Sequence, residues 1–244
     1  MLRRLLSLCL LCVALSVRAQ PANATVDLSE FRATDRTNAM IEGGLLRVDW
    51  PIAARESGQV VLNLEPNRPL FERLAVAGKP LLQNVTPVTL ITIGERDLRN
   101  PAGWVAFFDN PPQRAYRIVS AVLTKKTVRV TSAGSRTVIR IGDVVAGSFA
   151  GAIEITLVRN SPIVFVETVV KTAEDGRAIL YDAGLASTTP DWTALVWRDP
   201  QGALQRVRLE PSRVVAPVRV GGRALAVEAK GGGTVVSFPP PHQY

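Results

Sequence analysis

The sequence predicts an all-β fold, a large antiparallel β-sandwich of about thirteen strands. Apolar and polar residues alternate with a period of two in many short segments. Turn residues separate these segments at the spacing of a sandwich or barrel, and no helical stripe of useful length follows residue 41. These three observations favour stacked β-sheets over any fold that contains helices.

The clearest strand pattern lies between residues 151 and 185. Segment 152–159 alternates strictly, and segment 163–171 is apolar at nearly every position. A turn at 174–176 leads into a third segment, 177–182. We expect adjacent antiparallel strands here, with 163–171 covered on both faces, at the centre of a large sheet or between two sheets.

The remaining strands follow from the same alternation. They are expected at 45–50, 59–64, 70–76, 81–82, 88–93, 104–108, 116–123, 127–131, 136–141, 192–197, 204–209, 213–220, 224–228 and 234–238. Asp199-Pro200-Gln201-Gly202 has the residue order of a type I turn. Composition does not change along the chain, so residues 43–238 are expected to form a single β-sandwich domain after an irregular lead-in at 20–42.

Residues 1–19 have the organisation of a signal peptide. Arg3 and Arg4 precede an apolar run at 5–17, and Val17-Arg18-Ala19 ends in a small residue. The run is too short to cross a membrane comfortably, so we expect cleavage before Gln20 rather than an uncleaved anchor. The protein is then secreted or periplasmic, with no transmembrane segment after signal removal.

Both cysteines, Cys9 and Cys12, lie inside the signal peptide. The mature chain therefore has no thiol nucleophile, thiolate metal site or disulfide. An exported chain of this length without disulfides is stabilised by its core, which favours a bacterial origin.

The chain is basic, with a formal net charge of +8. Removing Arg3, Arg4 and Arg18 leaves 26 basic and 21 acidic residues, a net charge of +5. Most of these cations are dispersed singly along strands, whereas nucleic-acid-binding proteins concentrate them on one face among aromatics. We therefore expect no nucleic-acid partner, while attraction to anionic glycans or a cell envelope stays open.

The only histidine, His242, lies in the proline-rich tail at 239–244. A histidine base, a histidine-bearing triad and a histidine-rich metal site are thus excluded from the core. We expect no metal and no cofactor. The tail itself has the composition of an extended connector to a further domain, or of a frayed or truncated end.

Two carboxylates are weak catalytic candidates. Glu167 stands among Val164, Phe165, Val166, Val169 and Val170, where partial burial would suit it to general acid catalysis. It is alternatively a strand glutamate that faces solvent or pairs with an arginine. Asp182 either lines a pocket at the end of its strand or caps the following turn.

Aromatic residues suggest a sugar-binding face. Trp104 and Phe108 precede Asp109 and Asn110, and Tyr181 and Trp192 lie on later strands. Aromatic rings beside carboxylate and amide groups recognise sugars by stacking and hydrogen bonding. The alternative is that these aromatics fill the core of a wide sandwich.

Residues 45–82 and 151–185 resemble the opening and the middle strands of galactose-mutarotase-like super-sandwich domains. The resemblance implies a curved sheet that binds sugar, as in aldose epimerases and in modules of polysaccharide lyases and glycoside hydrolases. It carries over no catalytic residue, because the histidines of the epimerases have no counterpart in residues 20–238.

We therefore expect an exported, non-catalytic carbohydrate-binding or accessory β-sandwich module of a carbohydrate-active system. Its expected partner is a carbohydrate or polysaccharide, and a C-terminal catalytic domain in a longer chain is a further candidate partner. One alternative is a metal-independent polysaccharide lyase or glycoside hydrolase that uses carboxylates with Tyr181 or arginines. Another is a structural envelope protein.

Overall fold

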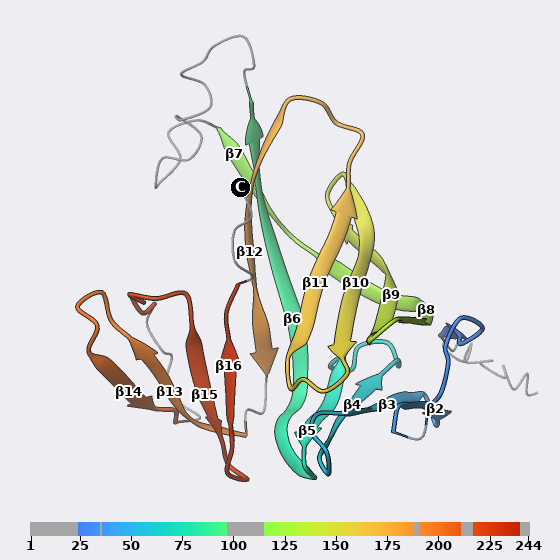
Figure 1. Cartoon of the computed structure of the whole chain (residues 1–244). Helices are drawn as coiled ribbons and strands as arrows, with labels where there is room; N and C mark the ends of the chain where they lie inside the picture. Colours follow the sequence, from blue (N-terminus) through green and yellow to red (C-terminus); the bar gives the residue numbers. More distant parts are fainter. Residues whose placement is uncertain (1–23, 35, 97–114, 188–190, 211–216, 240–244) are drawn as a thin grey trace, which may run out of the picture.

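The computed structural model describes residues 24–34, 36–96, 115–187, 191–210 and 217–239. Every regular element among them is a β-strand, so the predicted all-β sandwich is confirmed (Figure 1). The described strands number sixteen instead of about thirteen. The expected strand at 104–108 lies outside the described residues.

The first sheet has five strands in the order β1-β8-β9-β10-β11. Their bounds are β1 (Thr25–Asp27), β8 (Val122–Ala133), β9 (Arg136–Ala146), β10 (Phe149–Val158) and β11 (Val164–Lys171). Strand β1 runs parallel to β8, and the other neighbours are antiparallel. Short turns therefore connect β8 through β11 in sequence order.

The second sheet has seven strands, in the order β12-β6-β5-β4-β3-β2, with β7 also paired to β6. Their bounds are β2 (Asn38–Glu42), β3 (Leu45–Pro51), β4 (Ser57–Asn63), β5 (Phe71–Val76), β6 (Lys79–Glu95), β7 (Tyr116–Ser120) and β12 (Arg177–Ser187). Every pairing is antiparallel. The chain thus builds this sheet as a meander and returns to it after the first sheet.

The third sheet has four strands in the order β14-β13-β15-β16. Their bounds are β13 (Trp192–Arg198), β14 (Leu204–Arg208), β15 (Leu225–Ala229) and β16 (Thr234–Ser237). Figure 1 shows this sheet beside β6 and β12. The candidate functional site lies at the boundary between the second and third sheets.

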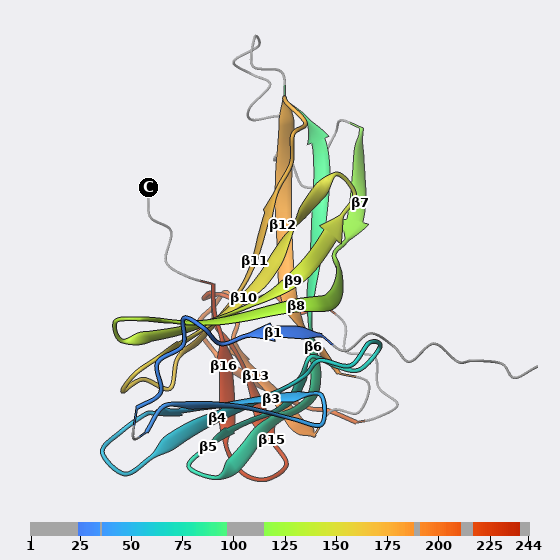
Figure 2. The same ribbon diagram turned by 90° about the vertical axis from the view of Figure 1, so that its right-hand side faces the viewer.

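The core lies between the first and second sheets, which are stacked with β1 and β8 over β3 and β4 (Figure 2). The inward positions of each strand are the apolar ones of the two-residue alternation. The central side chains, all fully or almost fully buried, are Leu46, Val48, Trp50, Val60, Leu62, Val130, Ile139, Ile141 and Ile155. Burying a side chain of this size stabilises the fold by about 1.5–3 kcal/mol.

One long strand, β6, replaces the two strands expected at 81–82 and 88–93. At about 3.3 Å per residue, it is roughly 55 Å long. Its first part pairs with β5, and its second part pairs with β12 and β7. Pro87 lies between Val85, the last residue of β6 that pairs with β5, and Leu90, the first that pairs with β7. Neither β5 nor β7 pairs with β6 at Pro87, so the missing N–H of proline is tolerated there.

Two expectations about position were wrong. Segment 163–171, expected to be covered on both faces, forms β11 at the edge of the first sheet, with Phe165 and Val169 exposed. The lead-in at 20–42, expected to be irregular, contributes β1 and β2. An apolar pattern indicates that a segment can form a strand, but it does not determine whether that strand is central or at the edge of its sheet.

Candidate functional site

The aromatic residues predicted to bind sugar are not brought together among the described residues. Trp104, Phe108, Asp109 and Asn110 lie outside those residues. Tyr181 is half-exposed on β12, opposite Ile91 of β6. Trp192 begins β13 and packs against the main core, next to Asp191, whose side chain contacts Gln83 of β6. Eight strand residues, roughly 26 Å, separate Gln83 from Ile91.

The two candidate carboxylates lie on opposite outer faces of the sandwich. The hydroxyls of Thr89 on β6 and Thr168 on β11 are hydrogen-bonded at 2.7 Å between the two sheets, so both point inward. Glu167 is next to Thr168, and Asp182 is opposite Leu90, so both point outward. Both are exposed. Glu167 is thus the solvent-facing strand glutamate of the alternative interpretation, and its expected partial burial is wrong because its side chain lies on the outer face of the sheet.

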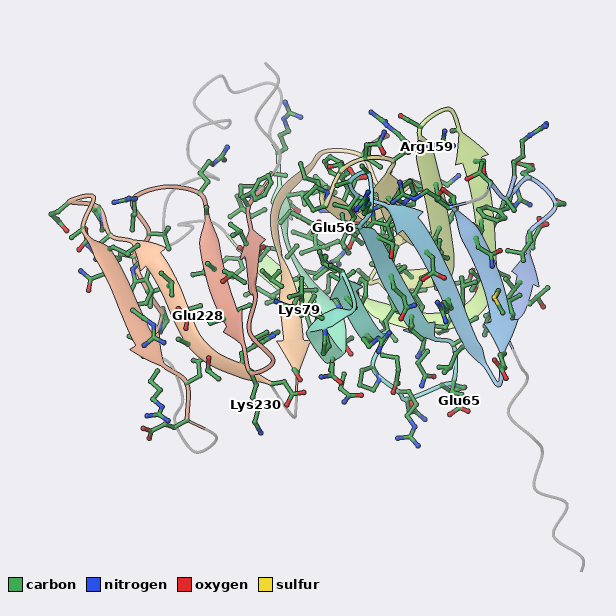
Figure 3. The ribbon with its side chains drawn as sticks, turned by 60° about the horizontal axis from the view of Figure 1, so that its bottom comes forward. Glu56, Glu65, Lys79, Arg159, Glu228 and Lys230 are labelled. Atoms are coloured by element: carbon green, nitrogen blue, oxygen red, sulfur yellow. The ribbon has the colours of Figure 1, made fainter. Side chains whose placement is uncertain are left out.

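A groove lies where the second sheet meets the third. It has a volume of about 320 Å³ and is lined by Pro80, Leu81, Gln83, Asp191, Ala229, Lys230 and Gly231. Its polar side chains come from three places: Gln83 from β6, Asp191 from the residue before β13, and Lys230 from the turn between β15 and β16. Figure 3 shows Lys230 at that turn, with Lys79 at the start of β6. The groove is therefore an interface between sheets.

Hydrogen bonds fix the centre of this groove. The side-chain amide of Gln83 donates to Oδ2 of Asp191 at 2.9 Å, and the backbone N–H of Lys230 donates to the carbonyl oxygen of Asp191 at 2.7 Å. Oδ1 of Asp191 and the ammonium of Lys230 form no further hydrogen bond or ion pair with the part of the chain that the structure describes. An acceptor and a donor thus remain for a ligand.

Glycine allows the turn between β15 and β16 to approach β6. A Cβ on Gly233 would lie 2.5 Å from Cδ2 of Leu81, and φ of Gly233 is 147°. Gly232 also has a positive φ, 77°. The glycine run at 231–233 thus forms a tight turn that sets one wall of the groove.

The groove can bind hydroxyl-rich molecules better than it can bind a metal. Pro80 and Leu81 supply an apolar wall, and a carboxylate, an amide and an ammonium supply acceptors and donors. No group of three histidine, cysteine or acid side chains able to hold a metal ion occurs among the described residues. The groove is therefore a candidate site for a small polar ligand.

Sequence reasoning missed Gln83 and Lys230, and it assigned Trp192 rather than Asp191 to the site. Both missed residues are ordinary polar positions of strands or turns, and only the packing of the third sheet against β6 brings them together. The one available signal was the run at 231–233, because consecutive glycines mark a close backbone approach.

The fold and groove define a class, an all-β sandwich with a polar groove at a sheet junction. No protein-family model matches the chain, and no curated protein matches it significantly. Over the described residues, no helix has the length and apolar character needed to cross a bilayer.

Proposed function

We propose that this chain is an exported, non-catalytic carbohydrate-binding β-sandwich that serves a larger carbohydrate-active system. One observation carries the proposal: the groove between the second and third sheets combines an apolar wall with Gln83, Asp191 and Lys230. Sugars present hydroxyl groups that both donate and accept, alternating with apolar ring faces. A carboxylate oxygen, an ammonium and an apolar wall in one groove complement that surface.

Two expectations from the sequence support the same proposal. The resemblance of residues 45–82 and 151–185 to galactose-mutarotase-like super-sandwich domains favours a sugar ligand, and the predicted signal peptide at 1–19 favours a secreted or periplasmic location. The role of an accessory module beside a catalytic domain belongs to the proposal as well. The enzyme alternative has less support, because Glu167 and Asp182 do not form a pair.

A glycan array probed with the purified mature chain tests the proposal. The glycans retained are then titrated by calorimetry against Lys230→Ala and Asp191→Asn, with Lys79→Ala as the matched control. Lys79 is exposed at the start of β6 and does not line the groove. We expect each groove variant to bind about tenfold more weakly, the usual cost of losing one charge-assisted hydrogen bond.

The control is expected to bind like the parent chain. Groove variants that bind as tightly as Lys79→Ala, or an array that retains no glycan, would contradict the proposal. Turnover of a polysaccharide panel that is lost in Glu167→Gln without loss of folding would instead favour the enzyme alternative.

A further inference from the structure

A second recess lies at one end of the sandwich and shares no lining residue with the groove. It has a volume of about 350 Å³ and lies where the end of β10 and the β8–β9 hairpin meet Arg32, Thr34 and Thr37. Its lining residues are Arg32, Thr34, Thr37, Trp50, Ser132, Gly134, Ser135, Arg136, Thr137, Leu157 and Arg159. Arg159 is labelled in Figure 3. No carboxylate of the described chain is among them.

The three arginines of this recess have no ion-pair partner among the residues that the structure describes. Arg32, Arg136 and Arg159 form no ion pair with any described carboxylate, although eight ion pairs occur elsewhere in the described chain. Guanidinium groups gathered around one recess repel one another, and a bound anion relieves this repulsion. Each guanidinium can also form two parallel hydrogen bonds to a carboxylate or a sulfate.

Threonines add hydroxyl groups to the lining of the recess. Thr37 and Thr137 are each only 6% exposed and line it together with Thr34. The hydroxyl of Thr34 accepts the N–H of Thr37 at 3.1 Å. Threonine hydroxyls can donate a hydrogen bond to an oxyanion, so they complement the positive charge of the arginines.

The backbone around the recess is held firmly. The N–H of Arg159 donates to the carbonyl oxygen of Ser135 at 2.8 Å, and the N–H of Arg32 donates to the hydroxyl of Ser132 at 2.9 Å. Trp50, 1% exposed, closes the floor and donates from Nε1 to the carbonyl oxygen of Ser161 at 2.9 Å. The recess is thus preorganised, which lowers the entropic cost of binding.

We propose that this recess binds the acidic group of a sugar, a uronate carboxylate or a sulfate ester. The arginines and hydroxyls alone indicate the anion. The assignment of the anion to a sugar rests on the proposed function and on the size of the recess. Its volume of about 350 Å³ falls within the range of organic-ligand sites, roughly 300–1,000 Å³, and is larger than an inorganic anion needs. A nucleic acid is disfavoured, because the only aromatic ring is buried and no base can stack on it.

Calorimetry with defined oligosaccharides tests the proposal. The probes are tetrasaccharides of galacturonate, glucuronate and mannuronate and a sulfated disaccharide, with cellotetraose as the neutral comparison and sodium sulfate as the inorganic one. We expect at least one acidic sugar to bind more tightly than cellotetraose and sulfate, with an affinity that falls as the salt concentration rises.

Substitutions assign the binding to the recess. Arg136→Gln and Arg159→Gln are each expected to weaken the acidic sugar about tenfold, and Thr137→Val about threefold. Arg208→Gln, an exposed arginine of β14, is the matched control and should leave the affinity within about twofold. Circular dichroism and the thermal midpoint confirm that each variant is folded.

The outcomes separate this proposal from the proposed function. Acidic sugars that bind no better than cellotetraose, or binding unchanged in both arginine variants, would overturn the acidic-sugar site. Sulfate that binds as tightly as every acidic sugar would overturn the sugar assignment too. Because Lys230→Ala affects only the groove, its effect on neutral glycans reports on the proposed function independently of this recess.

Discussion

The ammonium of Lys125 donates a hydrogen bond of 2.9 Å to the carbonyl oxygen of Asn63, joining β8 of the first sheet to the end of β4 in the second. A second bond of 2.9 Å reaches the carbonyl oxygen of Arg68, in the connection between β4 and β5. Lys125 is 5% exposed. One buried cation therefore satisfies two carbonyl groups of the opposite sheet.

Replacing Lys125 by methionine should lower the free energy of unfolding by about 3 kcal/mol, because two carbonyl groups lose their donor in a buried site. Urea denaturation measures the change. Lys126→Met, at the exposed neighbouring position, should change stability by less than about 0.5 kcal/mol. Equal effects of the two substitutions would show that the bonds of Lys125 are not structural.

The same lysine should make stability depend on alkaline pH. Desolvation lowers the pKa of Lys125 in the folded protein, and the nearby Glu65 carboxylate opposes this shift. The unfolded chain, with an ordinary lysine pKa of about 10.4, binds the proton more tightly, so unfolding takes up a proton in the interval between the two values. The free energy of unfolding should rise with pH through that interval, relative to Lys125→Met. Parallel pH profiles for the two proteins would refute this.

Gly58 faces the indole of Trp50, which also forms the floor of the arginine recess. A Cβ at position 58 would lie 2.3 Å from Cζ2 of Trp50, and the buried ring is held by its bond to Ser161. Gly58→Ala should therefore destabilise the protein by about 3 kcal/mol in thermal or urea unfolding. Gly222→Ala is the control, because no atom lies within 4 Å of the Cβ it would add.

Asp199 caps the hairpin that joins β13 to β14. Its Oδ1 accepts the N–H groups of Gln201 and Ala203 at 3.0 and 2.9 Å, and its Oδ2 accepts the amide of Gln205 at 2.7 Å. These bonds, chiefly that from Gln205, hold the pKa of Asp199 below its ordinary value. The resulting stabilisation is complete above the unfolded pKa of about 3.9 and is lost as the pH falls through the folded pKa.

Asp199→Asn should therefore lower stability at neutral pH and flatten the acid part of the stability profile. Hydrogen exchange of the amides of residues 201 and 203 locates the effect, since both lose a charged acceptor. Unchanged protection of these two amides in the variant would argue against the cap.

Local sequence patterns predicted the fold class. The features that they did not predict depend on contacts between residues far apart in the chain. The alternation of Ile153, Ile155 and Leu157 and the turn at Asp199 depend on nearby residues, and both predictions were confirmed. The edge position of β11 depends on which strands arrive beside it, which no pattern within 163–171 encodes.

The candidate sites were harder to predict for the same reason. Gln83 and Asp191 are separated by 108 positions in the chain and meet through the third sheet. Arg136 and Arg159 meet because Arg136 pairs with Val158 across β9 and β10, a register that only the structure shows. That Thr37 and Thr137 line the same recess as these arginines is likewise evident only from the packed structure.

Glu167 lies on the edge strand β11, and this position suggests a role other than that of a catalytic acid. Among the described strands β11 pairs only with β10, so its other edge presents backbone donors and acceptors to which another chain can add, the first step of aggregation. Glu167 and Lys171 are the two charges in this otherwise apolar and hydroxyl-bearing strand. A second copy that docked along this edge would have to strip water from both, so these two charges oppose edge-to-edge association.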